Sequence, residues 1–524
     1  MRKISTIKDH YGETRLFQSR ILFALLVVAG MLAMLAYRYT NLQIIHYETY
    51  RTQSDKNRVY VQPLPPKRGL IVDRYGTLLA NNEPSYNLVI VKERTSNLDD
   101  TLEKLNNIFN INEVELDKFQ QRLKRRKPFQ AVPLLYKLDE QAISLFYVNR
   151  HNLQGVDIKA QLVRHYPQGE QFSHVLGYVG RINSAEQNRL DELNYAGTDY
   201  VGKIGIEQYY EDELHGYVGS QHVETNARGR VLRVLEQSDA VPGADLVLNI
   251  DADLQIGIHE QLQGKRGAVV AIEPDTGAVL AMVSTPSFDP NAFVTGISTN
   301  DYSKLRDSID LPLFNRVLQG QYPPGSTVKP IYGLAGLHYN LTTPYSVVAD
   351  PGWYRLANDE RYYRDWKRGG HADFINLADS IMQSCDVYFY DLAIKLGIDR
   401  IHEFSAQFGL GEKTGIDSTN ERSGLLPSRD WKRRHKQLPW FPGETLNIGI
   451  GQGYMLATPM QLAVATATIA NRGLLPTPRI VKRINNRDIT AQLTPSATAN
   501  EEHWQTIIDA MEGVVHHKRG TATA

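Results

Sequence analysis

The chain has 524 residues, of which 42% are hydrophobic and 22% charged, and its Lys+Arg and Asp+Glu counts are both 58. A chain of this length is expected to form two or three domains rather than one. The formal net charge of zero argues against a nucleic-acid-binding protein, because such proteins usually carry a basic excess.

The N-terminus carries a basic segment followed by an apolar run, which predicts a membrane anchor. Residues 21–37 are uncharged and apolar over nearly a membrane-spanning length, and we assign the anchor to 21–40. Residues 1–20 contain five Lys/Arg against two acidic residues. This bias predicts a cytoplasmic tail at 1–20, a single pass through the inner (cytoplasmic) membrane and a periplasmic location for the rest. A cleaved signal peptide is the alternative, but residues 37–40 lack a small-x-small cleavage pattern and resemble an interfacial aromatic belt.

The segment that follows the anchor, residues 41–249, is expected to form a periplasmic pedestal without catalytic residues. A polar helical stalk at 40–60 leads to a proline-rich break, after which residues 70–80 alternate as strand, turn and strand. Residues 96–150 have a polar, basic helical pattern whose charge run is interpreted as a solvated face, with a lipid or protein contact as the alternative. Glycine turns then mark an extended region over 155–250.

Residues 250–524 are expected to form the catalytic module. A helix is predicted to start at Asp251, and the apolar runs 267–272 and 278–283 flank a hairpin signal. The remainder, from about 300 to 515, is mostly helical in pattern. The sequence therefore predicts an α+β protein with an anchor, an elongated mixed pedestal and a C-terminal module of antiparallel sheet with flanking helices.

The strongest chemical signal is Ser326-Thr327-Val328-Lys329, which follows two prolines and a glycine. An apolar run comes next, so Ser326 is expected at or near a helix start, with Lys329 on the same face of the first turn. A serine hydroxyl needs a neighbouring base to become a nucleophile, and a lysine can act as that base when burial favours its neutral form. The alternative is an N-cap serine followed by a surface lysine.

A second motif, Ser384-Cys385-Asp386, lies 58 positions after the first serine and precedes another helical pattern. Ser-x-x-Lys combined with Ser-x-Asn and Lys-Thr-Gly is the motif set of penicillin-binding proteins and class A β-lactamases. Here an aspartate replaces the asparagine. A second hydroxyl could relay protons between Ser326, Lys329 and a leaving amine, and Asp386 would bond the lysine or the substrate backbone.

Motifs throughout the chain resemble those of class B high-molecular-weight penicillin-binding proteins, in particular the penicillin-binding protein 2 group. Pedestal motifs begin at Arg68, Arg164 and Gly202, and further motifs of the catalytic module begin at Thr414 and Gly449. The resemblance covers nearly the whole length. It implies a serine-type D-Ala-D-Ala transpeptidase/carboxypeptidase that cross-links peptidoglycan during wall elongation.

The resemblance also implies a mechanism and partners. Ser326 would attack the penultimate D-alanine of a stem pentapeptide and expel the terminal D-alanine, after which an amine of a neighbouring stem peptide resolves the acyl-serine. The site residues would be Ser326, Lys329, Ser384 and Asp386, with no cofactor for the chemistry. The implied partners are the D-Ala-D-Ala stem peptide, β-lactam antibiotics, the membrane, and a SEDS glycosyltransferase (RodA) with other proteins of the elongation machinery.

The third family motif, Lys-Ser/Thr-Gly, is missing from the sequence. Lys518-Arg519-Gly520 resembles it superficially, but an arginine replaces the hydroxyl residue. Its position matches a family loop upstream of the true motif. We therefore expect a catalytic module that is incomplete at the C-terminus.

Four candidate metal ligands lie in one stretch that ends inside the second motif: Asp350, Asp365, His371 and Cys385. A thiolate, an imidazole and two carboxylates can form a closed tetrahedral zinc site. The spacing is irregular, so ordinary loop residues around a buried cysteine are the alternative. Cys385 is the only cysteine, and a lone thiol in an exported domain is a liability unless it is buried or ligated. We hypothesise a structural zinc that pins this loop and positions the second motif.

Two other functions fit parts of the pattern. A β-lactam sensor or β-lactamase-like hydrolase shares Ser-x-x-Lys, but it needs neither a large pedestal nor this anchor. A catalytically inert scaffold that activates a glycosyltransferase is compatible with the missing third motif. Rapid penicillin turnover would indicate the hydrolase, and rescue of wall synthesis by Ser326→Ala would indicate the scaffold.

Overall fold

The computed structural model describes residues 10–46, 59–124, 128, 130–225, 231–294, 296–357 and 359–523. The first helix, α1 (His10–Thr40), continues into a short π-helical segment, η1 (Asn41–Ile45). In the described ranges, one helical span, Gln18–Ile45, is long and apolar enough to cross a membrane, and its side chains are exposed. This agrees with a single-pass anchor. The predicted stalk at 40–60 falls mostly on residues outside the described ranges.

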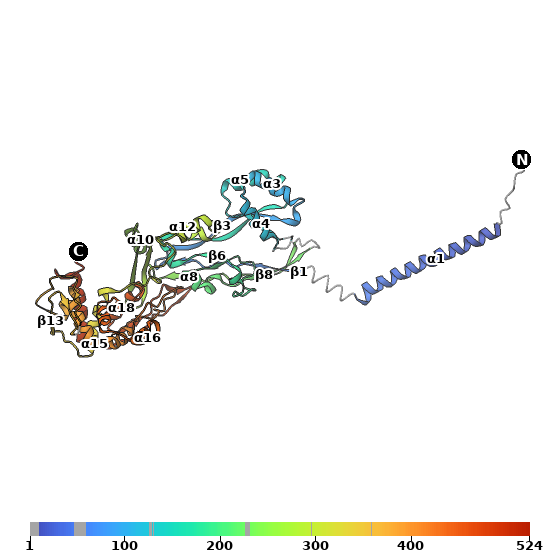
Figure 1. Cartoon of the computed structure of the whole chain (residues 1–524). Helices are drawn as coiled ribbons and strands as arrows, with labels where there is room; N and C mark the ends of the chain where they lie inside the picture. The colour runs from blue at the N-terminus through green and yellow to red at the C-terminus, as the bar shows by residue number, and fades with distance from the viewer. Residues whose placement is uncertain are drawn as a thin grey trace.

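The pedestal contains a three-stranded antiparallel sheet, which lies at the end of the pedestal nearer to α1 in Figure 1. Its strand order is β1–β8–β9. These strands are β1 (Val59–Leu64), β8 (Gly219–Thr225) and β9 (Val231–Ser238). β8 is the central strand and contains the buried Val223, whereas every residue of β9 is exposed.

A seven-stranded mixed sheet runs through the middle of the molecule in the order β19–β18–β10–β2–β3–β4, with β5 also paired to β3. Its strands are β2 (Ile71–Val72), β3 (Leu78–Val91), β4 (Ala131–Leu135), β5 (Val156–His165), β10 (Leu246–Leu248), β18 (Val481–Ile484) and β19 (Arg487–Asp488). β10 pairs in parallel with β2 and antiparallel with β18. The sheet thus joins pedestal strands to strands from the far end of the chain.

The predicted strand, turn and strand at 70–80 is confirmed by β2 and β3. Asp73 forms the turn, because its carboxylate accepts hydrogen bonds from the backbone N–H of Tyr75 and Thr77. The prediction that 96–150 is helical is partly wrong. Three helices are present, α3 (Leu98–Phe109), α4 (Glu113–Lys124) and α5 (Glu140–Asn149), but β4 lies between the last two. Val132 and Leu134 alternate with less buried residues along β4, and this period-two pattern is too short to stand out from its basic surroundings.

A buried ion-pair network ties the start of the pedestal to α8 (Gly205–Tyr209). The fully buried Glu207 accepts hydrogen bonds from Arg164 Nε at 2.6 Å and Arg68 Nε at 2.7 Å, and Arg68 also pairs with Glu211. Burial acts to raise the pKa of Glu207, but the charges of Arg164 and Arg68 outweigh it and hold this pKa below its ordinary value. These arginines therefore connect segments that are far apart in the sequence.

The C-terminal module begins with α10 (Ala252–Gln261), which follows the N-cap Asp251 as predicted. The predicted hairpin is confirmed by the antiparallel pair β11 (Gly267–Glu273) and β12 (Ala278–Thr285). The α-helices described beyond it are α11 (Asn291–Val294), α12 (Thr299–Arg306), α13 (Lys329–His338), α14 (Leu377–Met382), α15 (Asp386–Ala406), α16 (Arg429–Lys436), α17 (Pro442–Gly449), α18 (Pro459–Ala470) and α19 (Glu501–His516). The chain is an α+β protein, as the sequence predicts.

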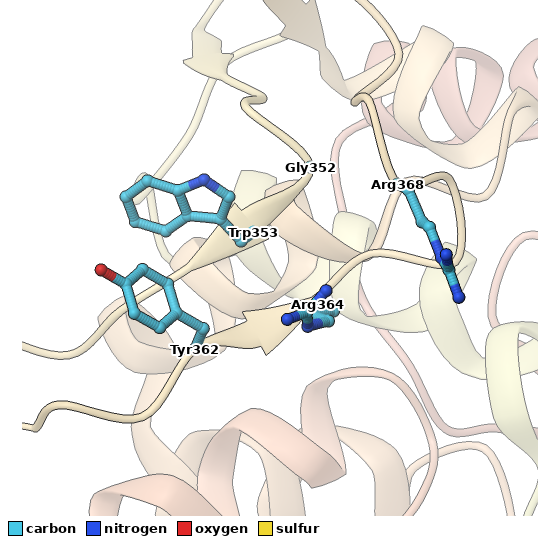
Figure 2. A pocket seen from close by; sticks show the side chains of 5 residues that line it. All are labelled: Gly352, Trp353, Tyr362, Arg364 and Arg368. Atoms are coloured by element: carbon cyan, nitrogen blue, oxygen red, sulfur yellow. The ribbon is translucent and has the colours of Figure 1, made fainter.

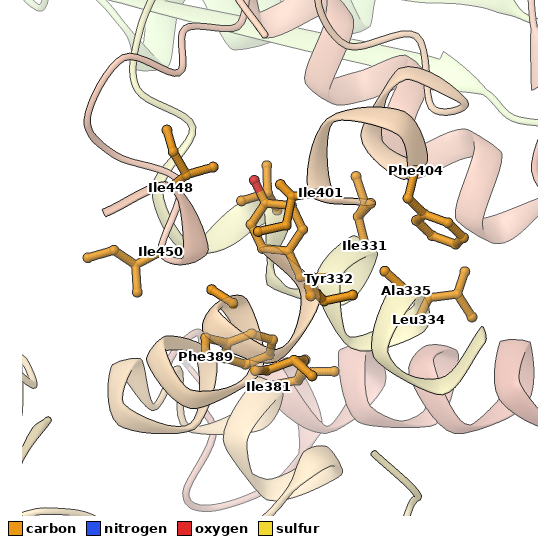
Figure 3. Close-up of a cluster of buried hydrophobic side chains, with 14 of the residues drawn as sticks. Ile331, Tyr332, Leu334, Ala335, Ile381, Phe389, Ile401, Phe404, Ile448 and Ile450 are labelled. Atoms are coloured by element: carbon orange, nitrogen blue, oxygen red, sulfur yellow. The ribbon is translucent and has the colours of Figure 1, made fainter. Parts of the chain in front are cut away.

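One apolar core holds the functional segments in place. Figure 3 shows side chains of α13, including Ile331 and Tyr332, packed with Phe389 and Phe404 of α15 and with Ile448 of α17. All of these side chains are at most 2% exposed. Close packing of this kind restrains the starts of α13 and α15 relative to each other, because neither helix can shift without opening a cavity.

Candidate active site

Ser326 lies in a 3₁₀ turn, Gly325–Val328, that leads directly into α13. The turn is closed by Thr327, whose hydroxyl donates to the carbonyl of Pro324 at 2.8 Å. Pro330 is accommodated because the first helical turn has no intrahelical N–H to lose. Ser326 is exposed, whereas the Lys329 side chain is only 1% exposed. The predicted helix start is thereby confirmed, and it presents a hydroxyl to solvent above a buried amine.

The structure brings the two sequence motifs together. The hydroxyl of Ser384 donates to Ser326 Oγ at 2.8 Å, and Lys329 Nζ donates to Ser384 Oγ at 3.3 Å and to the Ser384 carbonyl at 2.9 Å. The two hydroxyls and the amine therefore form one continuous chain of hydrogen bonds. Hydroxyl hydrogens can rotate, so each oxygen in such a chain can accept a proton on one side and donate one on the other.

Asp386 is the first residue of α15 and completes the cluster. Lys329 Nζ lies 2.6 Å from its Oδ1 and 5.5 Å from the centroid of the Phe389 ring. Burial raises the pKa of Asp386, and the neighbouring Lys329 charge offsets only part of this effect. All four predicted site residues thus meet at the adjoining starts of α13 and α15.

The four candidate metal ligands form a compact buried cluster. Donor atoms of Asp350, Asp365, His371 and Cys385 all lie within 4.8 Å of one another. Asp350 Oδ2 accepts from His371 Nδ1 at 2.8 Å and from the Cys385 thiol at 3.4 Å. The side chains of Asp350, Asp365 and His371 are at most 1% exposed, and Cys385 is fully buried. The hypothesis from the sequence therefore groups residues that are neighbours in space.

The charges of this cluster fit a divalent cation. Burial acts to raise the pKa of Asp350, but hydrogen bonds from the His371 backbone and ring and from Gly352 N–H outweigh it and hold this pKa below its ordinary value. Burial, with the nearby carboxylates, raises the pKa of the Cys385 thiol well above its ordinary value. Zinc bound here would take Cys385 as a thiolate, because a coordinated metal ion favours the deprotonated form of a thiol.

The superficial third motif does not lie in any of the strands that the structure describes. Residues 518–520 follow the end of α19 in a turn, where Arg519 donates to Asp379 of α14 at 3.1 Å. Its arginine therefore pairs with a helix of the core rather than with the serine cluster. This agrees with the interpretation that Lys518-Arg519-Gly520 is not the lysine-hydroxyl-glycine motif.

Comparison with known proteins identifies the family. The model described as "Penicillin binding protein transpeptidase domain" matches residues 267–524, and "Penicillin-binding Protein dimerisation domain" matches residues 63–248. The peptidoglycan D,D-transpeptidase MrdA of Acinetobacter baumannii is 43% identical over 99% of this chain and 78% of its own length. The chain belongs to the PBP2/MrdA family of class B peptidoglycan D,D-transpeptidases.

Solved structures of PBP2 proteins agree with this assignment. The complex between PBP2 and MreC from Helicobacter pylori matches 88% of this chain and 86% of the solved chain, with 32% identity and a TM-score of 0.79. A solved peptidoglycan synthase complex that coordinates polymerization and crosslinking matches 96% of this chain and 85% of the solved chain, with 30% identity and a TM-score of 0.67. The resemblance predicted from the motifs is therefore confirmed. Matches over both modules also argue against a β-lactamase-like hydrolase.

Sequence reasoning missed Trp366, which contacts the serine cluster of this PBP2-family chain. Its indole N–H donates to the Ser384 carbonyl at 3.0 Å, the same oxygen that Lys329 contacts. Ser384 has a positive φ of 57°, a conformation that costs a non-glycine residue roughly 1–2 kcal/mol. The bonds from Lys329 and Trp366 to its carbonyl help to offset that cost. The sequence signal that could have identified Trp366 is its position directly after the candidate ligand Asp365.

Gly451 also belongs to the site, although the sequence identified it only as part of a PBP2 family motif. Its carbonyl accepts from Gly325 N–H at 2.9 Å, directly before Ser326. Gly451 has φ +69°, and a Cβ at this position would clash with the carbonyl oxygen of Gly325. Only glycine combines this backbone conformation with such a close approach, so Gly451 fixes the position of the turn that carries Ser326.

Proposed function

We propose that this chain cross-links peptidoglycan stem peptides through an acyl-Ser326 intermediate in wall elongation and cell-shape maintenance. The observation that carries the proposal is the hydrogen-bonded chain from Ser326 Oγ through Ser384 Oγ to Lys329 Nζ, at 2.8 and 3.3 Å. It supplies an exposed nucleophile with a buried amine that can receive its proton through one intervening hydroxyl.

The steps follow from this relay. Ser326 Oγ bonds to the carbonyl carbon of the penultimate D-alanine while its proton passes through Ser384 to the neutral amine of Lys329. Collapse of the tetrahedral intermediate breaks the bond to the terminal D-alanine, whose nitrogen takes the proton back. The acceptor amine of a second stem peptide then attacks the ester carbonyl and gives its extra proton to the relay. The bond between this carbon and Ser326 Oγ breaks, and Oγ takes the proton back from the relay. Attack by water in place of that amine would give carboxypeptidase activity. A β-lactam would acylate Ser326 in the same way, and the resulting ester would persist because it is not resolved.

Asp386 is proposed as a positioning residue for this relay. Its contact of 2.6 Å holds Lys329 Nζ at the hydroxyl of Ser384. Burial raises the pKa of Asp386, and the neighbouring Lys329 offsets part of this effect. We propose this role because Asp386 contacts the lysine in the described structure and is not within hydrogen-bonding distance of Ser326.

We infer that the chain is anchored in the inner membrane with residues 1–20 in the cytoplasm, the pedestal at 41–249 and the transpeptidase module at 250–524, both in the periplasm. The exposed apolar span of α1 and the basic residues before it support this orientation. Relatives are solved with MreC and in a peptidoglycan synthase complex. By analogy, we propose that this chain works with MreC and with a SEDS glycosyltransferase such as RodA.

We further propose that Asp350, Asp365, His371 and Cys385 hold a structural zinc ion, while the chemistry itself needs no cofactor. Support comes from the closeness and burial of the four donors and from their charge. Asp365 Oδ2 also accepts from the backbone N–H of Asp386 at 2.7 Å, so an ion held here would stabilise the start of α15.

Covalent labelling with a fluorescent penicillin tests the proposed mechanism. The membrane-inserted protein should take up one label per chain and release it slowly. Ser326→Ala should not be labelled, and Ser384→Ala should be labelled much more slowly than the unmodified protein. Ser144→Ala is the matched control and should keep labelling, because this serine is exposed on α5 of the pedestal and its hydroxyl donates to the Glu140 carbonyl. Rapid release of the label would indicate a hydrolase, and wall synthesis rescued by Ser326→Ala would indicate a scaffold.

A further inference from the structure

A cavity of about 240 Å³ lies on the 350–371 loop (Figure 2). The same loop carries Asp350, Asp365 and His371 of the candidate metal cluster. It is lined by Gly352, Trp353, Tyr362, Arg364 and Arg368. Two short strands build it, β14 (Trp353–Tyr354) and β15 (Tyr363–Arg364), which pair with Trp353 opposite Arg364. Directly opposite side chains share one face of a sheet, and the adjacent residues turn to the other face.

The alternation along these strands separates the cavity from the core. Tyr363 is 7% exposed and packs near Tyr390 of α15, with 6.0 Å between ring centroids. Its neighbours Tyr362 and Arg364 are exposed on the opposite face. The cavity walls are therefore set by a hairpin whose other face is anchored in the apolar core.

The two arginines of the cavity have no ion-pair partner among the residues that the structure describes. Within the described ranges, neither Arg364 nor Arg368 has an ion pair or a side-chain hydrogen bond. Figure 2 shows Arg364 between the aromatic residues and Arg368. The rings of Trp353 and Tyr362 meet edge to face, with 4.9 Å between centroids. Two free guanidinium groups beside an aromatic wall suit a planar anion flanked by apolar or amide surface, and a carboxylate is the anion that a guanidinium binds in a bidentate way.

The cavity is coupled to the serine cluster through the residues between its two arginines. Trp366 bonds to the Ser384 carbonyl, and Asp365 bonds to the backbone N–H of Asp386. This segment also holds the part of the cavity wall formed by Gly352, because Asp365 N–H donates to the Gly352 carbonyl at 3.0 Å. A Cβ on Gly352 would clash with the Arg368 carbonyl. The same short segment therefore shapes the cavity and contacts the second catalytic motif.

We propose that this cavity is a subsite for a carboxylate group on the stem peptide whose D-alanyl end reacts at Ser326. Arg364 and Arg368 bind the carboxylate, and Trp353 and Tyr362 cover the neighbouring peptide planes. The inference rests on the proposed function for the identity of the peptide. It adds a specificity element: the site selects stem peptides that carry a free carboxylate over peptides in which that group is amidated.

Peptide binding to the full membrane protein in the Ser326→Ala background tests the subsite without any reaction. The probes are a dye-labelled pentapeptide that ends in D-Ala-D-Ala and bears free side-chain carboxylates, and the same peptide with those carboxylates amidated. Fluorescence anisotropy gives both dissociation constants. We expect the carboxylate form to bind about tenfold more tightly, the scale of a charge-assisted hydrogen bond, and the advantage to shrink as salt is raised.

Charge-neutral variants then locate the effect. Arg364→Gln with Arg368→Gln should remove the preference. Lys367→Gln, which removes one positive charge from an exposed loop residue outside the cavity lining, should retain it. Equal binding of the two peptides, or a preference that survives in the double arginine variant, would overturn the subsite. Penicillin labelling of the same variants with Ser326 intact is measured separately. A failure of that labelling in the unmodified protein would instead count against the acyl-serine mechanism.

Discussion

Lys329 Nζ lies 2.6 Å from Oδ1 of Asp386, and of these two side chains the lysine is buried to 1% exposure and the aspartate to 13%. The contact joins the first residue of α13 to the first residue of α15. A buried ammonium group is stable only with such a partner. The pair therefore fixes the distance between the two sequence motifs on which the proposed chemistry depends.

Replacing Lys329 by methionine should strongly lower the rate of penicillin acylation while the fold persists. Methionine fills a similar volume, and the raised pKa of Asp386 allows that carboxyl group to take up a proton once the lysine charge is gone. Loss of a general base lowers rates by about 10²–10⁴-fold. The measurement is the second-order acylation rate, with circular dichroism to verify folding. Asp386→Asn is the comparison variant: its amide oxygen can still accept from Lys329, so acylation should fall by no more than about tenfold.

Replacing Gly451 by alanine should slow acylation by displacing the serine turn. The added Cβ would clash with the Gly325 carbonyl at a backbone φ of +69°, a conformation that costs a non-glycine residue about 1–3 kcal/mol. The control is Gly257→Ala in α10, where a Cβ meets no atom within 4 Å and alanine should stabilise the helix by up to about 1 kcal/mol. Equal acylation rates in both variants would show that Gly451 does not position Ser326.

Replacing Glu207 by glutamine should destabilise the pedestal in a pH-dependent way. The change leaves the buried Arg164 and the mostly buried Arg68 without their shared counter-charge, which costs about 3–5 kcal/mol. Because the folded pKa of Glu207 is lowered, its contribution is present above the ordinary glutamate pKa of 4.5 and is lost as the pH falls through the folded pKa.

Thermal unfolding of both proteins across pH measures this effect. The gap in Tm between the unmodified protein and Glu207→Gln should be widest near neutral pH and should narrow below about 4.5. Glu115→Gln removes an exposed pair with Lys118 and should lower stability by less than about 1 kcal/mol. A Tm difference that stays constant over the whole pH range would mean that Glu207 stabilises the pedestal through its shape and not through its charge.

Zinc binding at the buried cluster predicts about one equivalent of metal in the purified protein. Elemental analysis should show this metal in the unmodified protein and in Ser326→Ala, and its loss in Cys385→Ser. Since a bound ion stabilises the folded state, chelation should lower Tm in the first two proteins and leave Cys385→Ser unchanged. Zinc below about a tenth of an equivalent, with no difference in Cys385→Ser, would rule out the structural zinc.

Several features could be predicted from the sequence because their signals are local. The apolar run at 21–37, the hairpin around Asp275 and the helix start at Ser326 depend on residues within one or two turns of each other. The motif Ser-x-x-Lys is of the same kind, since its two side chains lie on one helical turn. Strand β4 was missed because a five-residue alternation between basic helices is a weak local signal.

What the sequence alone determined about this protein is its apolar N-terminal helix, its family, its α+β fold class and the residue types of its candidate site. Only the tertiary structure decided that Ser384 lies 2.8 Å from Ser326, that Trp366 bonds to Ser384, and that two unpaired arginines share one cavity. Each of these relationships joins segments that are brought together by the packing of α13, α15 and the 350–371 loop. Such packing depends on the summed burial of many side chains across the core, and no short stretch of sequence contains that information.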